Sequence, residues 1–515
     1  MTVQALQPYA ITAPGFYGLN TQDSSLDLAS GFALSAVNCV IDQYGRVGSR
    51  KGWTALNSSS TDLGTHNVEM IVELIANNGT SYVLCAGNNK LFTYSGGSLT
   101  TLSYGGGGVT PTITASNWQA VAINGYVVFY QSGHDPLIFD PATSTTTYKR
   151  ISEHSTYAGT VQKGNAVIAA YGRTWSADVS GDKVTVQWSD LQAPCVFTGG
   201  TSGTLDTTQV WPKGTDSIMA LGAHNGFLFI FGKNNILVYQ NATDPSSMSL
   251  QDVVTGVGCV ARDSVSNTGT DIIFLSNTGV RSLLRTIQEK SAPFRELSKN
   301  VRNDLMGYVA AETSTTIKGI HSPIDAFYIL HLQNSNIVYC FDTKAKLQDD
   351  SARVTTWDSL LPTALFAKAD GTLLLGQAGY IGYYHGNTDN GSNYRFSYKT
   401  NHTDFGAPVV TTIPKRMLVT VVGGNDQIVT LKWAYDFTGN FYSQNVSIPG
   451  NNVAYFGESE YNYGYEFASG QVLTTLRAYP TSAGKVVQFA FESTIGGAPL
   501  SIQKIEIHAK NGKIT

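Results

Sequence analysis

The residues of this chain that could perform acid–base, metal or nucleophilic chemistry are scattered along the sequence. The nine histidines show neither HxxxH nor HExxH spacing, the patterns that place two metal ligands on one face of a helix. Glycoside hydrolysis needs two carboxylates across one cleft, or a tyrosine backed by a glutamate, and Glu73, Glu153 and Glu312 have no such partner in the sequence. There is no Walker-type lysine loop and no GxSxG motif. The sequence therefore indicates no catalytic centre, no cofactor site and no metal site, and we expect a protein that is not an enzyme.

Three short stretches match known motifs only formally. "STDLGTHN", residues 60–67, is nearest to the S-x-D-x-G-x-x-W turn that sialidase propellers repeat, but it occurs once and has Asn in place of Trp. "NTDNGSN", residues 387–393, resembles a calcium loop without its final glutamate. "GVGCVARD", residues 256–263, fits GxGxxA, which binds a pyrophosphate only between a strand and a helix, whereas a β-run follows here. We expect no ligand at any of them.

Composition narrows the class of protein. Only 14% of the residues are charged, against about 25% in a typical soluble domain, and the formal net charge of −4 gives no basic excess for general nucleic-acid binding. Five cysteines lie far apart without a CxxC pair, and Cys85, Cys259 and Cys340 sit in or beside apolar runs, so we expect buried thiols. No signal peptide and no apolar run of membrane-spanning length is visible. We expect a chain made and kept soluble in a cytosol.

The elements that must position any site are short β-hairpins that recur along the chain. Seven units each contain an apolar run, a tight turn, a second run, another turn and a third run. Asn-Gly, the favoured dipeptide of hairpin turns, occurs in three of them. Weaker fourth strands are predicted at "TTTYKRI" and "RVTTWD". The first turns lie near residues 79, 125, 172, 226, 268, 324 and 371, a mean spacing of about 49 residues that is typical of a four-stranded propeller blade.

This period predicts an all-β fold: a seven-bladed β-propeller with an N-terminal β-rich segment and a C-terminal β-sandwich-like domain. The predicted boundaries are 1–60 for the N-terminal assembly segment, 61–392 for the propeller and 393–515 for the C-terminal domain. The alternative is a chain of hairpins folded as sandwiches, which gives turns without a longer period. The fifth unit is the weakest, because its first strand is poorly defined.

Two regions depart from the hairpin pattern. In residues 294–311, Leu297, Val301 and Leu305 recur every four residues, which predicts a short amphipathic helix in a connection between blades. After Gly391, "KRMLVTVVGGNDQIVTLKWAYDF" and "GKVVQFAFESTIGGAPLSIQKIEIHAK" each read as two paired strands. The aromatic and acidic stretch between them is expected to form a projecting loop.

One stretch near the N-terminus carries more charge than its turn requires. In "NCVIDQYGRVGSRKGW", residues 38–53, the sequence from Asp42 to Gly45 suits a type I turn, with Asp at its first position and Gly at its last. Arg46, Arg50 and Lys51 follow within six residues. They could be solvated flanks of a hairpin, or they could fix this segment to the rest of the chain or to a partner.

The stretch from Gly18 to Trp53 resembles the N-terminal signature of tail proteins of short-tailed bacteriophages, variously called tail nozzle, tail tubular protein B or head–tail stabilisation protein. In that family a "G-L-N" entry leads to an Asn, an Asp-x-x-Gly-Arg turn and then Arg-x-Gly. The matching positions here are Asn38, Asp42, Gly45, Arg46, Arg50 and Gly52. The ending "GKVVQFAFESTIGGAPLSIQKIEIHAKNGKI" also looks like the family's C-terminal strands. Some relatives carry long insertions for tail fibres, which are absent here, so direct fibre attachment is in doubt.

The resemblance implies a propeller with accessory β-domains that forms a homo-hexameric ring. It further implies a structural virion protein of the tail, synthesised in the host cytoplasm and placed below the portal and adaptor proteins, with tail fibre or needle proteins as further partners. The ring would retain the packaged genomic DNA and form the channel for its ejection, without sequence-specific binding. A mildly acidic wall would keep phosphates from adhering. Asn38, Asp42, Arg46, Arg50 and Lys51 are the candidate assembly or partner contacts.

Two other functions stay open at this point. A receptor- or glycan-binding propeller at the tail tip would use the tyrosine-rich stretch 455–470, where Tyr461, Tyr463 and Tyr465 could stack on sugar rings and contact the host envelope. A propeller glycosidase is the less favoured alternative.

Overall fold

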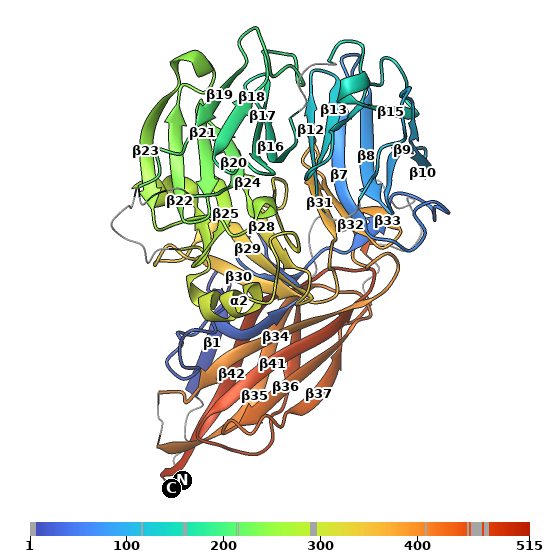
Figure 1. Ribbon diagram of the computed structural model, residues 1–515. Coiled ribbons are helices and arrows are strands. Elements are labelled where there is room, and N and C mark those ends of the chain that lie inside the picture. The colour runs from blue at the N-terminus through green and yellow to red at the C-terminus, as the bar shows by residue number, and fades with distance from the viewer. Residues whose placement is uncertain are drawn as a thin grey trace.

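The computed structural model describes residues 7–114, 117–157, 162–212, 214, 216–288, 296–406, 409–450, 453–454, 466–467 and 473–514. The protein is all-β: its described helices longer than one turn are two short α-helices, α1 (Leu283–Gln288) and α2 (Arg302–Val309). Figure 1 shows small sheets side by side in the upper part of the molecule and larger sheets below them.

Seven small, mainly antiparallel sheets follow one another along residues 68–384, and each predicted unit forms one of them; the sixth is continuous with a larger ten-stranded sheet. Positive φ angles at Asn124 and Gly125 fit the type I′ turn that an Asn-Gly hairpin favours. The predicted fourth strands at "TTTYKRI" and "RVTTWD" are confirmed as β15 and β30, and the fifth sheet has the predicted weak first strand of two residues. Sheet by sheet and in chain order, the strands are β7 (Val68–Ile75), β8 (Ser81–Gly87), β9 (Lys90–Ser95) and β10 (Ser98–Thr101); β11 (Ser103–Tyr104), β12 (Trp118–Ile123), β13 (Tyr126–Gln131), β14 (Leu137–Phe139) and β15 (Thr147–Arg150); β16 (Gly164–Ala170), β17 (Arg173–Val179), β18 (Thr185–Trp188) and β19 (Gly203–Asp206); β20 (Ile218–His224), β21 (Phe227–Gly232), β22 (Asn235–Gln240) and β23 (Ser249–Thr255); β24 (Ser266–Asn267), β25 (Ile272–Ser276) and β26 (Gly279–Ser282); β27 (Ile317–Ser322), β28 (Phe327–Leu332), β29 (Ile337–Lys346) and β30 (Ala352–Trp357); and β31 (Ala364–Ala367), β32 (Leu373–Gln377) and β33 (Tyr380–Tyr384).

One strand of each sheet, here called its inner strand, contacts the inner strand of the next sheet. The contacts run from β7 to β12, β16, β20, β24, β27 and β31, and β31 contacts β7 again, so the series closes on itself. Separate clusters of buried apolar side chains fill the spaces between neighbouring sheets. A small meander cannot bury both of its apolar faces alone, and in this arrangement each sheet buries them against its two neighbours.

The seventh sheet is completed by a strand from the start of the chain. β6 (Trp53–Ala55) pairs antiparallel with β33, in the register Trp53 with Tyr384 and Ala55 with Gly382. The side chain of Trp53 lies where Gly382 leaves room, because a Cβ atom on Gly382 would be 2.4 Å from the indole ring. No pattern in residues 53–55 predicts this pairing.

The predicted helix between the fifth and sixth sheets is confirmed as α2, preceded by a 3-10 turn (Lys299–Val301). Val301, Leu305 and Val309 are buried in one apolar cluster with Tyr328 and Tyr339 of the sixth sheet. Asp304 lies in the first turn, where a negative charge complements the helix dipole.

Below the seven sheets, two larger groups of strands face each other across an apolar core. The core includes Val419 and Ile505 from one sheet and Leu431 and Phe491 from the other. One sheet has the order β4-β5-β42-β35-β40, with β1 also pairing β42; the other continues from β30 through β2, β3, β34, β41 and β36 to β37. The strands are β1 (Gln7–Thr12), β2 (Gly18–Leu19), β3 (Phe32–Val37), β4 (Cys39–Ile41), β5 (Val47–Ser49), β34 (Tyr394–Thr403), β35 (Val410–Gly423), β36 (Ile428–Tyr435), β37 (Tyr442–Ser447), β40 (Leu473–Ala478), β41 (Val487–Ile495) and β42 (Leu500–Ile514); β38 (Val453–Ala454) and β39 (Glu466–Phe467) pair with each other.

Both strand pairs predicted for the C-terminal region are wrong in their pairing. β35 and β36 lie in different sheets, and so do β41 and β42. The turn at Gly423 and Gly424, both with positive φ, carries the chain from one sheet to the other. Alternation of polar and apolar residues determines which face of a strand is buried. The same alternation occurs whether the next strand pairs with it in one sheet or packs against it from the opposite sheet.

The N-terminal segment predicted at 1–60 forms no sheet of its own among the described residues. Strands β1 to β5 join the two lower groups of strands, and β6 joins the seventh small sheet. β1 pairs with β42, at the other end of the sequence, in the register Gln7 with Ala509 to Thr12 with Lys504.

Candidate functional site

The turn of the 38–53 stretch forms as predicted and uses its first two charged residues internally. The side chain of Asp42 accepts hydrogen bonds from the backbone N–H groups of Tyr44 (2.8 Å) and Arg46 (3.0 Å). Its other oxygen accepts one from Nε of Arg46 at 2.6 Å. The guanidinium of Arg46 lies 4.4 Å from the centre of the Tyr44 ring. Asp42 and Arg46 therefore stabilise the connection between β4 and β5.

Asn38 is buried and takes the left-handed conformation, with φ at 53°. Its Nδ2 donates to Oδ1 of Asp358 (2.5 Å) and to the backbone carbonyl of Arg395 (2.8 Å), and its Oδ1 accepts from the backbone N–H of Asp358 (3.2 Å). One side chain thus ties the N-terminal stretch to the segments that follow β30 and begin β34.

Arg50 is the centre of this region, because its side chain is completely buried and paired with a carboxylate. Nη1 and Nη2 donate to the two carboxylate oxygens of Asp389 at 2.8 and 2.6 Å, the planar two-bond geometry that Arg and carboxylates form best. Nη2 also donates to Oγ of Ser359 (2.8 Å), and Nη1 to the carbonyl of Lys51 (2.8 Å). The ring of Tyr394 lies 4.0 Å from the guanidinium carbon. A charge taken out of water needs this full set of partners.

The next two residues attach the same stretch to neighbouring loops. Nζ of Lys51 lies 2.6 Å from Oδ1 of Asp325, in an ion pair whose lysine side chain is 46% exposed. Gly52 packs so closely that a Cβ atom would lie 1.9 Å from the carbonyl oxygen of Thr388. Only glycine fits there. We call Asn38, Arg50, Gly52, Asp358 and Asp389 the N-terminal joint.

The structure thus places the predicted partner contacts as follows. Asn38 and Arg50 are buried and bonded within the chain, so a partner cannot reach their side chains; for these two the predicted contact is replaced by an internal one. Asp42 and Arg46 hold their own turn, and Lys51 is half exposed. Tyr461, Tyr463 and Tyr465 lie outside the described residues. The internal partner Asp389 comes from the stretch resembling a calcium loop, and no sequence signal linked it to Arg50, 339 residues away.

A second charged cluster lies in a cavity of about 360 Å³ between the inner strands of the small sheets. Arg262, in the 3-10 turn Arg262–Ser264, donates from Nη1 to the carbonyl of Asn165 (2.7 Å) and from Nη2 to the carbonyl of Trp118 (2.9 Å). Its Nε lies 2.6 Å from Asp263, whose other oxygen lies 2.5 Å from Nζ of Lys318. These five residues, the inner-strand cluster, connect the second, third and sixth sheets through the guanidinium of Arg262 and the carboxylate of Asp263.

The charge of Asp263 is fixed by its neighbours. Burial alone would raise the pKa of its carboxyl, but the charges of Arg262 and Lys318 outweigh burial and hold the pKa well below the usual range. The aspartate is therefore charged over the whole physiological pH range. Arg262 and Asp263 belong to "GVGCVARD", whose glycine pattern resembles only a nucleotide fingerprint, and no signal in the sequence indicated their role.

The scattered acids occupy structural positions. Glu312 accepts hydrogen bonds from the backbone N–H groups of Asn334 (3.1 Å) and Ser335 (2.9 Å). Glu73 accepts from the hydroxyl of Ser81 (2.7 Å), and Glu153 from that of Tyr104. The described residues contain no group of three or more His, Cys, Asp or Glu side chains that could hold a metal ion. All five cysteines are buried and free, as the sequence predicted for Cys85, Cys259 and Cys340.

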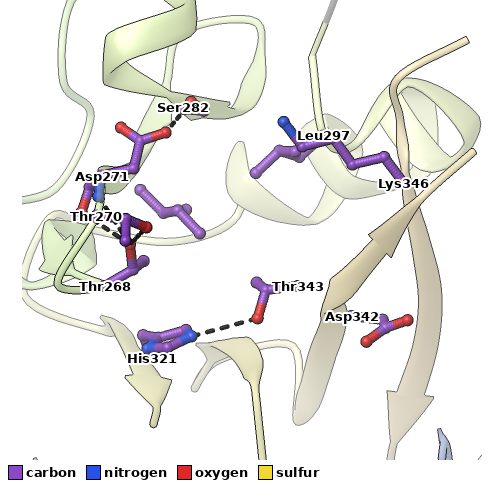
Figure 2. Close-up of a pocket in the computed structure, with 10 residues that line it drawn as sticks. Thr268, Thr270, Asp271, Ser282, Leu297, His321, Asp342, Thr343 and Lys346 are labelled. Carbon is purple, nitrogen blue, oxygen red and sulfur yellow. Dashed lines mark hydrogen bonds between the residues drawn. The ribbon is translucent and has the colours of Figure 1, made fainter. Parts of the chain in front are cut away.

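A third feature is a pocket of about 280 Å³ at the junction of the fifth and sixth sheets. Figure 2 shows Asp271 and Thr270 on one side, His321 and Thr343 below, and Lys346 extended beside Leu297 on the other side. Nε2 of His321 lies 3.2 Å from the hydroxyl of Thr343. Burial lowers the pKa of His321, so its ring is neutral at pH 7.

Comparisons with known proteins leave the family open. No family model matches the chain, and no curated protein matches it. Among solved structures, the extracellular domain of a one-component system of B. thetaiotaomicron is 11% identical with a TM-score of 0.41, covering 66% of this chain and 40% of its own length. The WD40 domain of Neurospora crassa Pan2 (9%, TM-score 0.38) covers 65% of this chain and 95% of its own. The WD40 β-propeller domain of Doa1 (10%, TM-score 0.38) covers 64% and 96%. At these scores the likeness carries no argument about function. Of the described helices, none is long and apolar enough to cross a membrane.

Proposed function

We propose that the seven small sheets are the blades of a seven-bladed β-propeller and that the two lower groups of strands form a β-sandwich. The closed series of contacts among inner strands supports the propeller, and β6 would complete its last blade. The core shared by β35, β42, β36 and β41 supports the sandwich. The N-terminal joint would hold these two parts in a fixed relation.

We further propose that the chain is a structural virion protein: the tail nozzle of a short-tailed bacteriophage. One observation carries this proposal. Most of the residues through which the sequence resembles that family lie in the N-terminal joint or in the turn beside it. The turn itself uses only one arginine, Arg46, and Arg50 serves the joint. Every protein built from a propeller and a sandwich in this arrangement needs residues that join the two parts. We therefore propose that the family signature is the set of residues that forms this connection. The buried pair of Arg50 and Asp389 is its centre.

In this function the N-terminal joint would resist movement of the propeller relative to the sandwich. A homo-hexameric ring below the portal and adaptor must retain pressurised DNA, so relative movement of propeller and sandwich would open the channel. Lys51, half exposed beside Asp325, is the candidate partner contact whose side chain an adaptor carboxylate could reach. Enzymatic chemistry has no part in this function.

The test is the copy number of the chain in particles produced from the genome that encodes it. Quantitative mass spectrometry of purified virions, with the portal and major capsid proteins as internal standards, should give about half the portal's copy number, as expected for a sixfold ring on a twelvefold portal. Absence from the particle would overturn the proposal. A copy number of three or fewer, as for a needle or tip protein, would favour the receptor-binding alternative instead.

A further inference from the structure

The pocket between the fifth and sixth sheets, shown in Figure 2, has walls of opposite chemical character. Its first wall is the loop from Thr268 to Asp271, between β24 and β25. Oδ2 of Asp271 accepts a hydrogen bond from the hydroxyl of Ser282, and Oδ1 accepts from the backbone N–H groups of Ile272 (2.7 Å) and Leu284 (3.0 Å). A carboxylate has about four acceptor positions, so Asp271 is held rigidly with one of them still available.

The hydroxyl of Thr270 extends this wall. It lies 3.4 Å from the hydroxyl of Thr268, a long contact, and the Thr268 hydroxyl itself bonds the backbone N–H and carbonyl of Asp271 at 3.0 Å each. Thr270 therefore offers a donor and an acceptor to whatever enters the pocket. Together with Asp271 it suits a ligand whose groups both donate and accept, as alcohols do.

The opposite wall carries a cation. Lys346, at the end of β29, extends across the pocket toward the side of Asp271 (Figure 2), and no described carboxylate forms an ion pair with its ammonium group. Asp342, on the same strand, is already paired with Lys344 (3.3 Å) and Arg353 (3.5 Å). Lys346 is thus the cation of this pocket that has charge to offer to a ligand.

The floor of the pocket offers a ligand one polar atom without a hydrogen-bond partner and some apolar surface. Nδ1 of His321 has no hydrogen-bond partner among the described residues, and buried polar atoms in that state usually bind water or a ligand. Ile273 and Leu297 provide apolar surface beside it. The volume of about 280 Å³ is below the roughly 300–1,000 Å³ of sites for drug-sized ligands, which limits the occupant to a single small ring.

From these features we infer that the pocket binds one acidic sugar ring, a hexuronic acid or a sugar of the same charge and size. The carboxylate of the ligand meets Lys346, its hydroxyls meet Asp271, Thr270 and Thr343, and its C–H face packs on Leu297. This inference rests on the pocket alone and is independent of the role in a virion.

Calorimetric titration of the full chain with sodium glucuronate, glucose and sodium sulfate tests the inference. Saturable binding of glucuronate, at least about tenfold tighter than that of glucose and weakened by salt, is the expected result, since one charged hydrogen bond contributes about that factor. Absence of saturable binding overturns the inference. Equal affinity for sulfate and glucuronate also overturns it, because the pocket would then hold an adventitious ion only.

Two variants locate the ligand. Lys346→Met should weaken glucuronate binding about tenfold and leave glucose unchanged, while Thr270→Val should weaken both sugars. The matched control is Lys415→Met, an exposed lysine on β35 in the other part of the molecule. Circular dichroism melting curves identical to those of the parent chain show that the variants fold. If Lys346→Met binds glucuronate as tightly as Lys415→Met does, the assignment is wrong.

Discussion

Removing the carboxylate of the N-terminal joint should be among the most damaging single changes in this chain. In Asp389→Ala the guanidinium of Arg50 would remain completely buried, without the oxygens that now lie 2.6 and 2.8 Å from it. Breaking a buried ion pair by removing one partner costs about 3–5 kcal/mol, because the other charge cannot return to water. Ser359 and the carbonyl of Lys51 would still accept hydrogen bonds, so we expect the lower half of that range.

Equilibrium unfolding in urea, followed by tryptophan fluorescence, measures this loss. Trp357 is a suitable probe, since its ring lies 5.9 Å from the Arg50 guanidinium. Lys51→Met is the matched control: it removes the adjacent cation, whose ion pair is partly exposed and should contribute at most about 1 kcal/mol.

The double variant Arg50→Met/Asp389→Ala separates lost charge balance from lost packing. It should be more stable than the sum of the single changes by about 2 kcal/mol or more, because neither charge is then buried alone. Two results would refute this reasoning. One is that Asp389→Ala lowers the free energy of unfolding no more than Lys51→Met does; the other is that the losses of the Arg50→Met and Asp389→Ala single variants add up to that of the double variant.

Two further predictions concern close packing and charge. Gly52→Ala should cost about 2 kcal/mol or more, because its Cβ would overlap the Thr388 carbonyl; Gly107→Ala, where a Cβ meets nothing within 4 Å, is the control, and equal melting temperatures for the two variants would contradict the packing argument. Asp263, with its depressed pKa, contributes stability that is fully present above its unfolded pKa of about 3.9 and is lost as pH falls toward the folded value. Unfolding free energies measured between pH 5 and pH 2 should therefore fall more steeply for the parent chain than for Asp263→Asn, and parallel curves would show that the aspartate is not held charged.

The local parts of this fold could be predicted from the sequence because their causes are local. Asn124-Gly125 specifies its own turn through the φ angles that these residues tolerate, and Leu305 and Val309 specify the buried face of α2. Turns of this kind at a regular spacing are sufficient to predict the number of small sheets. The weak start of the fifth sheet was visible for the same reason, since the stretch from Ser266 to Thr270 contains no apolar residue except glycine.

Contacts between distant segments could not be predicted in this way. β6 has three residues and pairs with a strand more than 320 positions later, so no pattern within it identifies its partner. The charges of Arg50 and Asp389 were both visible, but nothing in either stretch linked them. The same holds for Arg262 and Lys318, which meet through Asp263 only because the inner strands converge. For β35 and β36, the alternation of polar and apolar residues predicted both strands. It did not show whether the two strands pair in one sheet or lie in opposite sheets.

The pairing of β1 with β42 has a consequence for how the chain is made. Residues 7–12 are synthesised about 500 residues before their partners at 504–509. At about 5–20 residues per second, the early strand waits roughly half a minute or more, with its backbone groups unpaired. β6 waits similarly for β33. The pairing of β1 therefore forms only after β42 has been translated, and a chain interrupted before β42 would present open strand edges to chaperones and proteases. The topology thus favours the survival of chains that extend through β42.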